Sequence, residues 1–127
     1  MLIRGVFADE RNYYRQQTKT AVPLKWMAPE TVQEAKYTSK SDVWAFGVLG
    51  YEVTSLGMTP YGALGGQELM AELERGYRLQ QPPQCPPNVF PLLLQCWQMA
   101  AEARPSFAVL LQQLKALDAA HAQDTAV

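Results

Sequence analysis

The sequence is poor in the residues that build metal centres and disulfide frameworks. Its 127 residues include a single histidine, His121, and two cysteines, Cys85 and Cys96. The cysteines form no C-x-x-C pair and have no histidine near them in the sequence, so we expect no metal site in this chain. Two cysteines without a framework are typical of proteins in a reducing compartment, and we expect a cytoplasmic location.

A charge of one sign and a long hydrophobic run are also missing. Eleven basic and twelve acidic side chains leave a formal net charge of −1. The apolar stretches are short, as in residues 43–51. A membrane-spanning helix needs about 20 apolar residues, and a phosphate-binding surface needs an excess of basic residues. We therefore expect neither nucleic acid nor membrane contact by this segment, whereas the 48% hydrophobic content supports one globular domain.

Strand-like alternation is absent as well, whereas helical periodicity recurs along the chain. The strongest segment begins at Ser39, whose spacing to Asp42 has the S-x-x-D form of a capping box, and it continues through an apolar run to Val53. A helix that is hydrophobic nearly all round must be covered by neighbours on several sides. The sequence therefore predicts an all-α fold with this helix at its centre.

Three further helices are predicted after the central one. The first runs from about Gln67 to Gly76, because glycine readily takes the left-handed conformation that ends a helix. The second follows Asn88, and its inner face consists of Phe90, Leu93, Leu94 and Trp97. The last begins at Pro105, and its inner face consists of Phe107, Leu110, Leu111, Leu114 and Leu117. Beyond Asp118 we expect the chain to fray.

Three motifs in one order give the chain a resemblance to a known family. They are "PLKWMAPE" at residues 23–30, "SDVWAFGV" at 41–48 and "CWQMAAEARPSF" at 96–107. Together they resemble the second half of the activation segment and the helical C-terminal lobe of protein tyrosine kinases of the receptor type. The resemblance implies a partial activation segment over residues 1–30, a helical kinase C-lobe over 31–117, a tail over 118–127, and no β-rich N-terminal lobe.

The resemblance also implies a substrate-binding loop and a regulatory site. A tyrosine phenol reaches farther from its backbone than a serine hydroxyl, so a tyrosine kinase must hold its substrate farther from the catalytic base. In the family this platform is the loop that corresponds here to Pro23, Leu24, Lys25 and Trp26. The pair Tyr13 and Tyr14 resembles the activation-loop tyrosines whose phosphorylation orders the loop against arginines.

Four more positions are expected to be structural. The family pattern pairs Glu30 with Arg104 in a buried ion pair, and it places Trp44 in the central helix. In an intact kinase Asp42 would accept hydrogen bonds from backbone N–H groups of the catalytic loop. The alternative is that Asp42 is only a helix-start carboxylate interacting with the helix dipole.

Several kinase motifs are absent from the sequence. It contains no G-x-G-x-x-G, no V-A-I-K, no H-R-D and no D-F-G, and His121 is followed by alanine. We therefore assign no catalytic residue and no cofactor to this chain, and expect ATP and Mg²⁺ to bind the full-length parent. The isolated chain is predicted to be inactive as an enzyme.

The expected partners are protein substrates, signalling proteins and the rest of a kinase domain. A catalytically dead binding module or decoy lobe is the alternative function. The segment "QQPPQCPP" at residues 80–87 offers a third reading, as a polyproline II ligand for an SH3 or WW domain.

Overall fold

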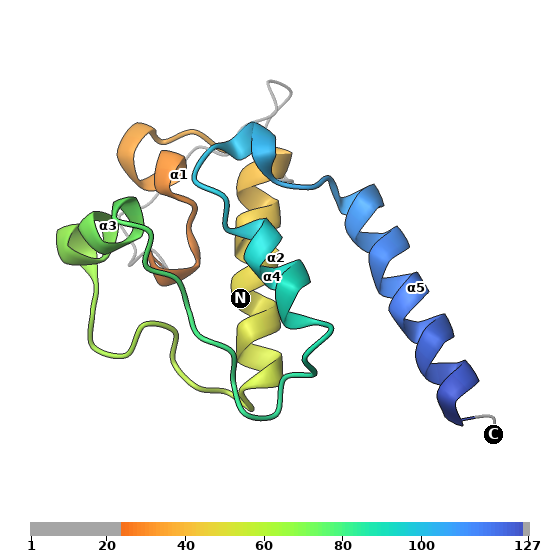
Figure 1. Ribbon diagram of the computed structural model, residues 1–127. Helices are drawn as coiled ribbons and strands as arrows, with labels where there is room; N and C mark the ends of the chain where they lie inside the picture. The colour runs from red at the N-terminus through yellow and green to blue at the C-terminus, as the bar shows by residue number, and fades with distance from the viewer. Residues whose placement is uncertain (1–23, 126–127) are drawn as a thin grey trace.

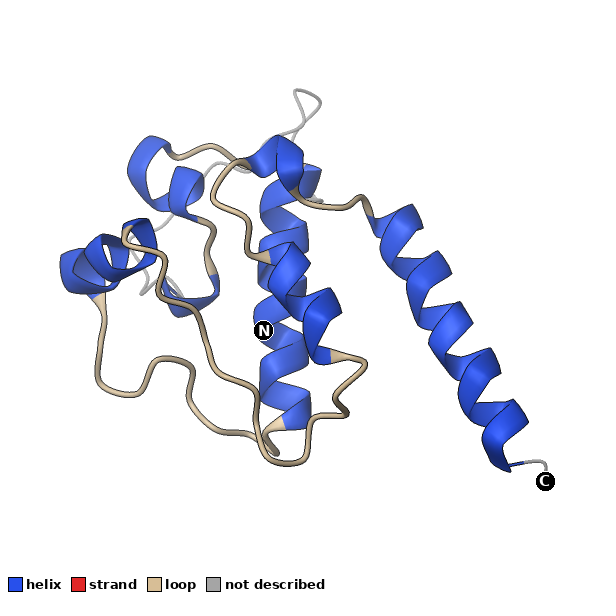
Figure 2. Ribbon diagram, viewed as in Figure 1, coloured by secondary structure: helices blue, strands red, loops and turns tan. Residues whose placement is uncertain are grey.

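The computed structural model describes residues 24–125, with side chains up to residue 120. All regular elements in this range are helical (Figures 1 and 2), which confirms the predicted all-α class for the described part of the chain. In chain order they are the 3-10 helix η2 (Leu24–Trp26), α1 (Pro29–Glu34), α2 (Ser39–Thr54), α3 (Gly66–Glu74), α4 (Phe90–Cys96), the 3-10 helix η3 (Ala101–Ala103) and α5 (Phe107–Thr125).

Helix α2 forms the centre of the fold (Figure 1). Val43, Trp44 and Val48 on this helix are completely buried, as expected for a helix that is apolar nearly all round. Its capping box lies one residue earlier than predicted: the Thr38 side chain accepts from the Ser41 backbone N–H, and the Ser41 hydroxyl accepts from the Thr38 N–H at 2.6 Å. The extended Thr38 is the cap because Ser39 is already helical.

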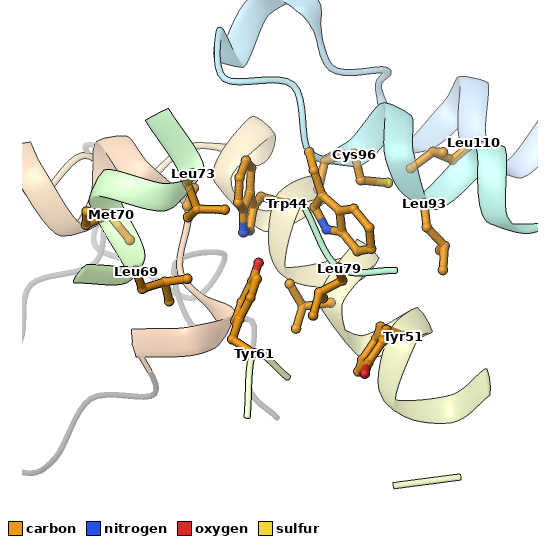
Figure 3. Packing of buried hydrophobic residues seen from close by; sticks show 14 of the residues in the cluster. Trp44, Tyr51, Tyr61, Leu69, Met70, Leu73, Leu79, Leu93, Cys96 and Leu110 are labelled. Atoms are coloured by element: carbon orange, nitrogen blue, oxygen red, sulfur yellow. The ribbon is translucent and has the colours of Figure 1, made fainter. Parts of the chain in front are cut away.

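The hydrophobic core lies between α2 and the helices packed around it. Figure 3 shows Leu69, Met70 and Leu73 of α3 near Trp44, whereas Leu93 and Cys96 of α4 lie farther along α2. Trp97, directly after α4, is also buried, but Leu94, which we predicted to face inward, is 40% exposed. Helix α4 has only seven residues, so it presents a narrower inner face than the predicted pattern.

Helix α3 ends as the sequence predicts. Gly76 has φ of 103°, and its N–H donates to the Leu73 carbonyl at 3.0 Å while the Tyr77 N–H donates to the Glu72 carbonyl at 2.9 Å. These two hydrogen bonds form a Schellman motif, which satisfies carbonyls that the helix end leaves free. The left-handed glycine thus turns the chain from α3 back toward α4.

Helix α5 departs most from the prediction. It begins at Phe107 instead of Pro105, because Arg104 is extended, as residues before proline prefer, and the Ser106 hydroxyl caps the helix by accepting from the Val109 N–H at 3.2 Å. Within the predicted inner face, Leu110 is 2% exposed but Leu111 is 53% exposed. The helix slopes away from the other helices (Figure 1) and continues to Thr125.

The proline-rich segment is folded into the domain. The Cys85 N–H donates to the Pro82 carbonyl at 3.0 Å, and the Gln81 side chain donates to the Cys85 carbonyl at 3.1 Å. Pro82 and Cys85 are both buried. Pro83, Pro86 and Pro87 are exposed, but a polyproline II ligand is extended and has no internal hydrogen bonds, so the turn at Pro82–Cys85 does not have the form of an SH3 or WW ligand.

Candidate functional site

The loop that begins the described chain is attached to two different elements. The indole N–H of Trp26 donates to a carboxylate oxygen of Glu52 on α2 at 2.7 Å. The neighbouring Lys25 ammonium donates to the backbone carbonyl of Gly62, in the loop between α2 and α3. Leu24, Lys25 and Trp26 are therefore placed side by side in η2, whereas Pro23, Tyr13 and Tyr14 lie outside the described residues.

Arg104 anchors the chain a few residues farther on. Its guanidinium forms a two-pronged ion pair with Glu30, with N–O distances of 2.7 and 2.8 Å. Its remaining N–H groups donate to the carbonyls of Lys40 at 3.0 Å, Gln98 at 2.8 Å and Met99 at 3.3 Å. All five donor positions of the arginine fork are thus used, although the side chain is almost completely buried. One residue therefore joins α1, the start of α2 and the chain before η3.

The Trp44 ring has two guanidinium groups within cation–π distance. The Arg104 carbon Cζ is 5.1 Å from the indole ring centroid, and the Arg78 Cζ is 5.5 Å from it. Arg78 itself donates to the carbonyls of Leu73 at 2.9 Å and Trp97 at 2.7 Å. Because Arg78 is held by backbone carbonyls and Arg104 by Glu30 and three carbonyls, each guanidinium is a fixed cation at cation–π distance from the tryptophan. Trp44 thus connects the Arg104 anchor to the end of α3.

Asp42 is the contrasting case, a buried carboxyl that no other described residue pairs with. The residue is 8% exposed, and its side chain accepts no hydrogen bond from the described part of the chain. Burial therefore raises the pKa of this carboxyl from 3.8 to about 6. The structure places Asp42 in the first turn of α2, two residues after Lys40, whose carbonyl accepts from Arg104, but no ion pair joins Asp42 to Arg104.

The buried Asp42 carboxyl should contribute less to the stability of the folded chain at neutral pH than in weak acid. With a folded pKa above the unfolded one, its contribution to stability is fully present below about pH 4 and is lost as the pH rises through about 6. The shift corresponds to at most about 3 kcal/mol, and partial solvation reduces it, so we expect Asp42→Asn to raise the free energy of unfolding at pH 7 by about 1 kcal/mol. Urea unfolding of both proteins at pH 7 and pH 4 tests this, since the difference should disappear at pH 4. An equal difference at both pH values would contradict it.

The chain matches the family model described as protein tyrosine and serine/threonine kinase over residues 2–114. It belongs to this kinase family. Its described helices form the helical C-terminal lobe of the kinase fold, as the motifs predicted. The kinase motif A-P-E is the start of α1, and its glutamate is the Glu30 that meets Arg104.

Individual relatives support the tyrosine kinase branch of the family. The chain is 42% identical over 116 residues to protein sevenless of Drosophila virilis, which is 91% of the chain. It is 42% identical over 108 residues, or 85% of the chain, to the human tyrosine-protein kinase Srms, and 42% identical over 106 residues, or 84%, to the zebrafish tyrosine-protein kinase receptor TYRO3. The aligned parts are 4%, 22% and 12% of these three proteins, so the chain spans a minor share of each.

Three residues of this kinase lobe were not singled out from the sequence. Glu52 and Gly62 hold the Trp26–Lys25 loop, and Arg78 flanks Trp44. A carboxylate within the otherwise apolar end of the central helix was a usable signal for Glu52. A backbone carbonyl such as that of Gly62 leaves no trace in a side-chain pattern.

Among the described helices, none is long and apolar enough to cross a membrane.

Proposed function

We propose that this chain carries the substrate platform and the structural anchor of a receptor-type protein tyrosine kinase. The parent protein would transfer phosphate from ATP to tyrosine in protein substrates. The observation that carries the proposal is the attachment of one short segment at both ends: Trp26 to Glu52 on α2, and Glu30 to Arg104. A loop held in this way can keep a substrate strand at a fixed distance from the catalytic base. Phosphoryl transfer requires this because its catalysis depends mainly on positioning.

Within this function each residue has a distinct role. Pro23, Leu24, Lys25 and Trp26 would contact the substrate, and phosphorylation of Tyr13 and Tyr14 would regulate the loop. Glu30 and Arg104 would fix the end of this segment to the lobe, and Trp44 would support Arg104 through the contact of its ring with the guanidinium. The unpartnered Asp42 carboxylate would accept backbone hydrogen bonds from the catalytic loop, which would lower its pKa again.

The chemistry would come from parts of the kinase that this sequence does not contain. The glycine loop, the phosphate-binding lysine, the catalytic aspartate and the ligands of Mg²⁺ are all needed to align ATP. The partners of this segment would be the rest of the kinase domain, protein substrates and signalling proteins, on the cytoplasmic side of a membrane-anchored receptor.

The function is tested with the purified 127-residue chain. We expect no ATP-dependent phosphorylation of a tyrosine peptide, because the chain lacks the phosphate-aligning motifs. Turnover that survives removal of contaminating kinases would contradict this.

In an NMR titration, we expect a tyrosine-containing peptide to perturb the backbone resonances of Lys25 and Trp26. A peptide that leaves these resonances unchanged, with all perturbations elsewhere, would overturn the assignment of the platform.

The size of the native polypeptide separates this function from its alternative. An immunoblot of source cells with an antibody against residues 60–90 should show a band much larger than 14.2 kDa. A band near 14.2 kDa would favour a free-standing binding module instead. The feature that such a module would offer to a partner is an apolar cavity of about 120 Å³ between α2, α4 and α5, lined by Phe46, Leu92, Leu93, Leu110 and Leu114 among others.

A further inference from the structure

The attachment of Trp26 to α2 depends on a single side chain. Trp26 donates its indole N–H to Glu52 Oε1 at 2.7 Å, across 26 residues of sequence and in a partly buried setting. Trp26 also packs against the hydrophobic core from the side. Packing limits where the ring can lie, and the hydrogen bond adds a directional restraint on its orientation, because it acts on one atom at the ring edge.

We propose that Glu52 is a positioning residue for the substrate platform, and that it acts by fixing the orientation of Trp26. This inference rests on the proposed function, because it assumes that the substrate contacts the loop of Lys25 and Trp26. Glu52 itself does not need to touch the substrate. It belongs to the central helix α2, so the hydrogen bond fixes the orientation of Trp26 relative to that helix.

Within residues 24–120 the charge of Glu52 has no ion-pair partner that would compete for it. None of the described cations forms an ion pair with Glu52, and the nearest candidate on the platform, Lys25, donates to the Gly62 carbonyl instead. A hydrogen bond to an ionised carboxylate is shorter and stronger than one between neutral groups, which agrees with the 2.7 Å separation. The Trp26–Glu52 contact is therefore a directed hydrogen bond that is not shared with a salt-bridge network.

The two contacts of the loop, made by Lys25 and Trp26, differ in the kind of acceptor that holds them. Lys25 is held by a backbone carbonyl, so no side-chain substitution at Gly62 can remove its acceptor directly. Trp26 is held by a side chain, so a substitution at Glu52 removes the acceptor while leaving the platform residues themselves unchanged. Glu52 is thus the place where the orientation of the platform can be altered without changing its chemistry.

The test uses two substitutions at Glu52 in the full 127-residue chain. Leucine removes the acceptor and keeps the side-chain size, whereas glutamine keeps an acceptor oxygen without the charge. We expect Glu52→Leu to move the indole N–H resonance of Trp26 and to weaken binding of a tyrosine peptide by about tenfold. Glu52→Gln should restore most of the affinity and an indole resonance close to that of the wild type.

A matched control is available on α3. Glu74 also accepts a side-chain N–H from the segment after the platform, because Gln33 on α1 donates to it at 3.0 Å, but this contact is exposed and involves no platform residue. Glu74→Leu should therefore leave both the Trp26 resonance and the peptide affinity unchanged. A loss of affinity in this control equal to that in Glu52→Leu would overturn the inference, because the effect would then be general.

The outcomes separate the inference from the function on which it rests. If the wild-type chain binds the peptide at Lys25 and Trp26 and both Glu52 variants bind equally well, only the role of Glu52 is overturned. If the wild-type chain does not bind the peptide there, the substrate-platform function itself fails, and the positioning role fails with it. Should Glu52→Leu prevent folding, Glu52→Ala, which also removes the acceptor, takes its place: weaker peptide binding with a moved indole resonance supports the role, and unchanged affinity overturns it.

Discussion

Replacing Arg104 with alanine should lower the free energy of unfolding by about 3–5 kcal/mol, more than any other exchange of a charged residue in the described chain. The substitution leaves the Glu30 carboxylate, which is 15% exposed, without the cation that faces it. It also removes the donors to three backbone carbonyls and the cation over the Trp44 ring. Urea unfolding followed by tryptophan fluorescence measures the loss.

Arg75 provides the control for this prediction. It also pairs with a glutamate, Glu72, but its side chain is 69% exposed. Arg75→Ala should cost less than about 1 kcal/mol, since an exposed pair gains little in water. Arg104→Lys should recover only a small part of the loss, because an ammonium group cannot reproduce the five-donor fork. Equal effects at the two arginines would show that the burial of Arg104 contributes nothing.

The same arginine shows how far sequence reasoning reaches at this site. The partnership of Glu30 with Arg104 follows from the kinase motifs, because the two residues belong to two quoted segments. The three carbonyl acceptors do not follow, since Gln98 and Met99 offer their backbone and not their side chains. A motif identifies the residues that meet, but the number of hydrogen bonds depends on how the backbone turns around η3.

Some parts of the fold could likewise be predicted from the sequence and others could not. Helix α2 was predictable because its residues are apolar on every side, and the end of α3 was predictable because a glycine at Gly76 has a specific local meaning. Helix α5 was also predictable as a helix, but the burial of its leucine face was not, because the pattern indicates which residues could be buried and not whether another element is present to cover them. Leu111 and Leu114 carry the pattern of an inner face, yet both are exposed here.

The close packing of α4 against α2 rests on Gly47. A methyl group added to Gly47 would lie 2.6 Å from the Trp97 indole nitrogen and 2.7 Å from the Cys96 Cβ atom. The Cys96 Cβ is bonded directly to the α4 backbone, and both neighbours are fully buried, so the clash can be relieved only by moving α4. Overpacking a tight contact of this kind usually costs about 1–3 kcal/mol.

We therefore expect Gly47→Ala to lower the free energy of unfolding by about 2–3 kcal/mol, even though alanine is the better helix former by about 1 kcal/mol. Urea unfolding gives the value, and Gly50→Ala on the same helix is the control. A methyl group at Gly50 would come within 2.7 Å of Leu93 Cδ2, the flexible end of a side chain that borders the apolar cavity, and the next atoms are 3.6 and 3.7 Å away. Leu93 can turn into that space, so Gly50→Ala should stay within about 1 kcal/mol of the wild type. A loss at Gly50 as large as that at Gly47 would mean that α4 approaches α2 closely along its whole length. The expected difference instead places the point of closest contact at Gly47, beside the Trp97 and Cys96 that join α4 to the chain leading to Arg104.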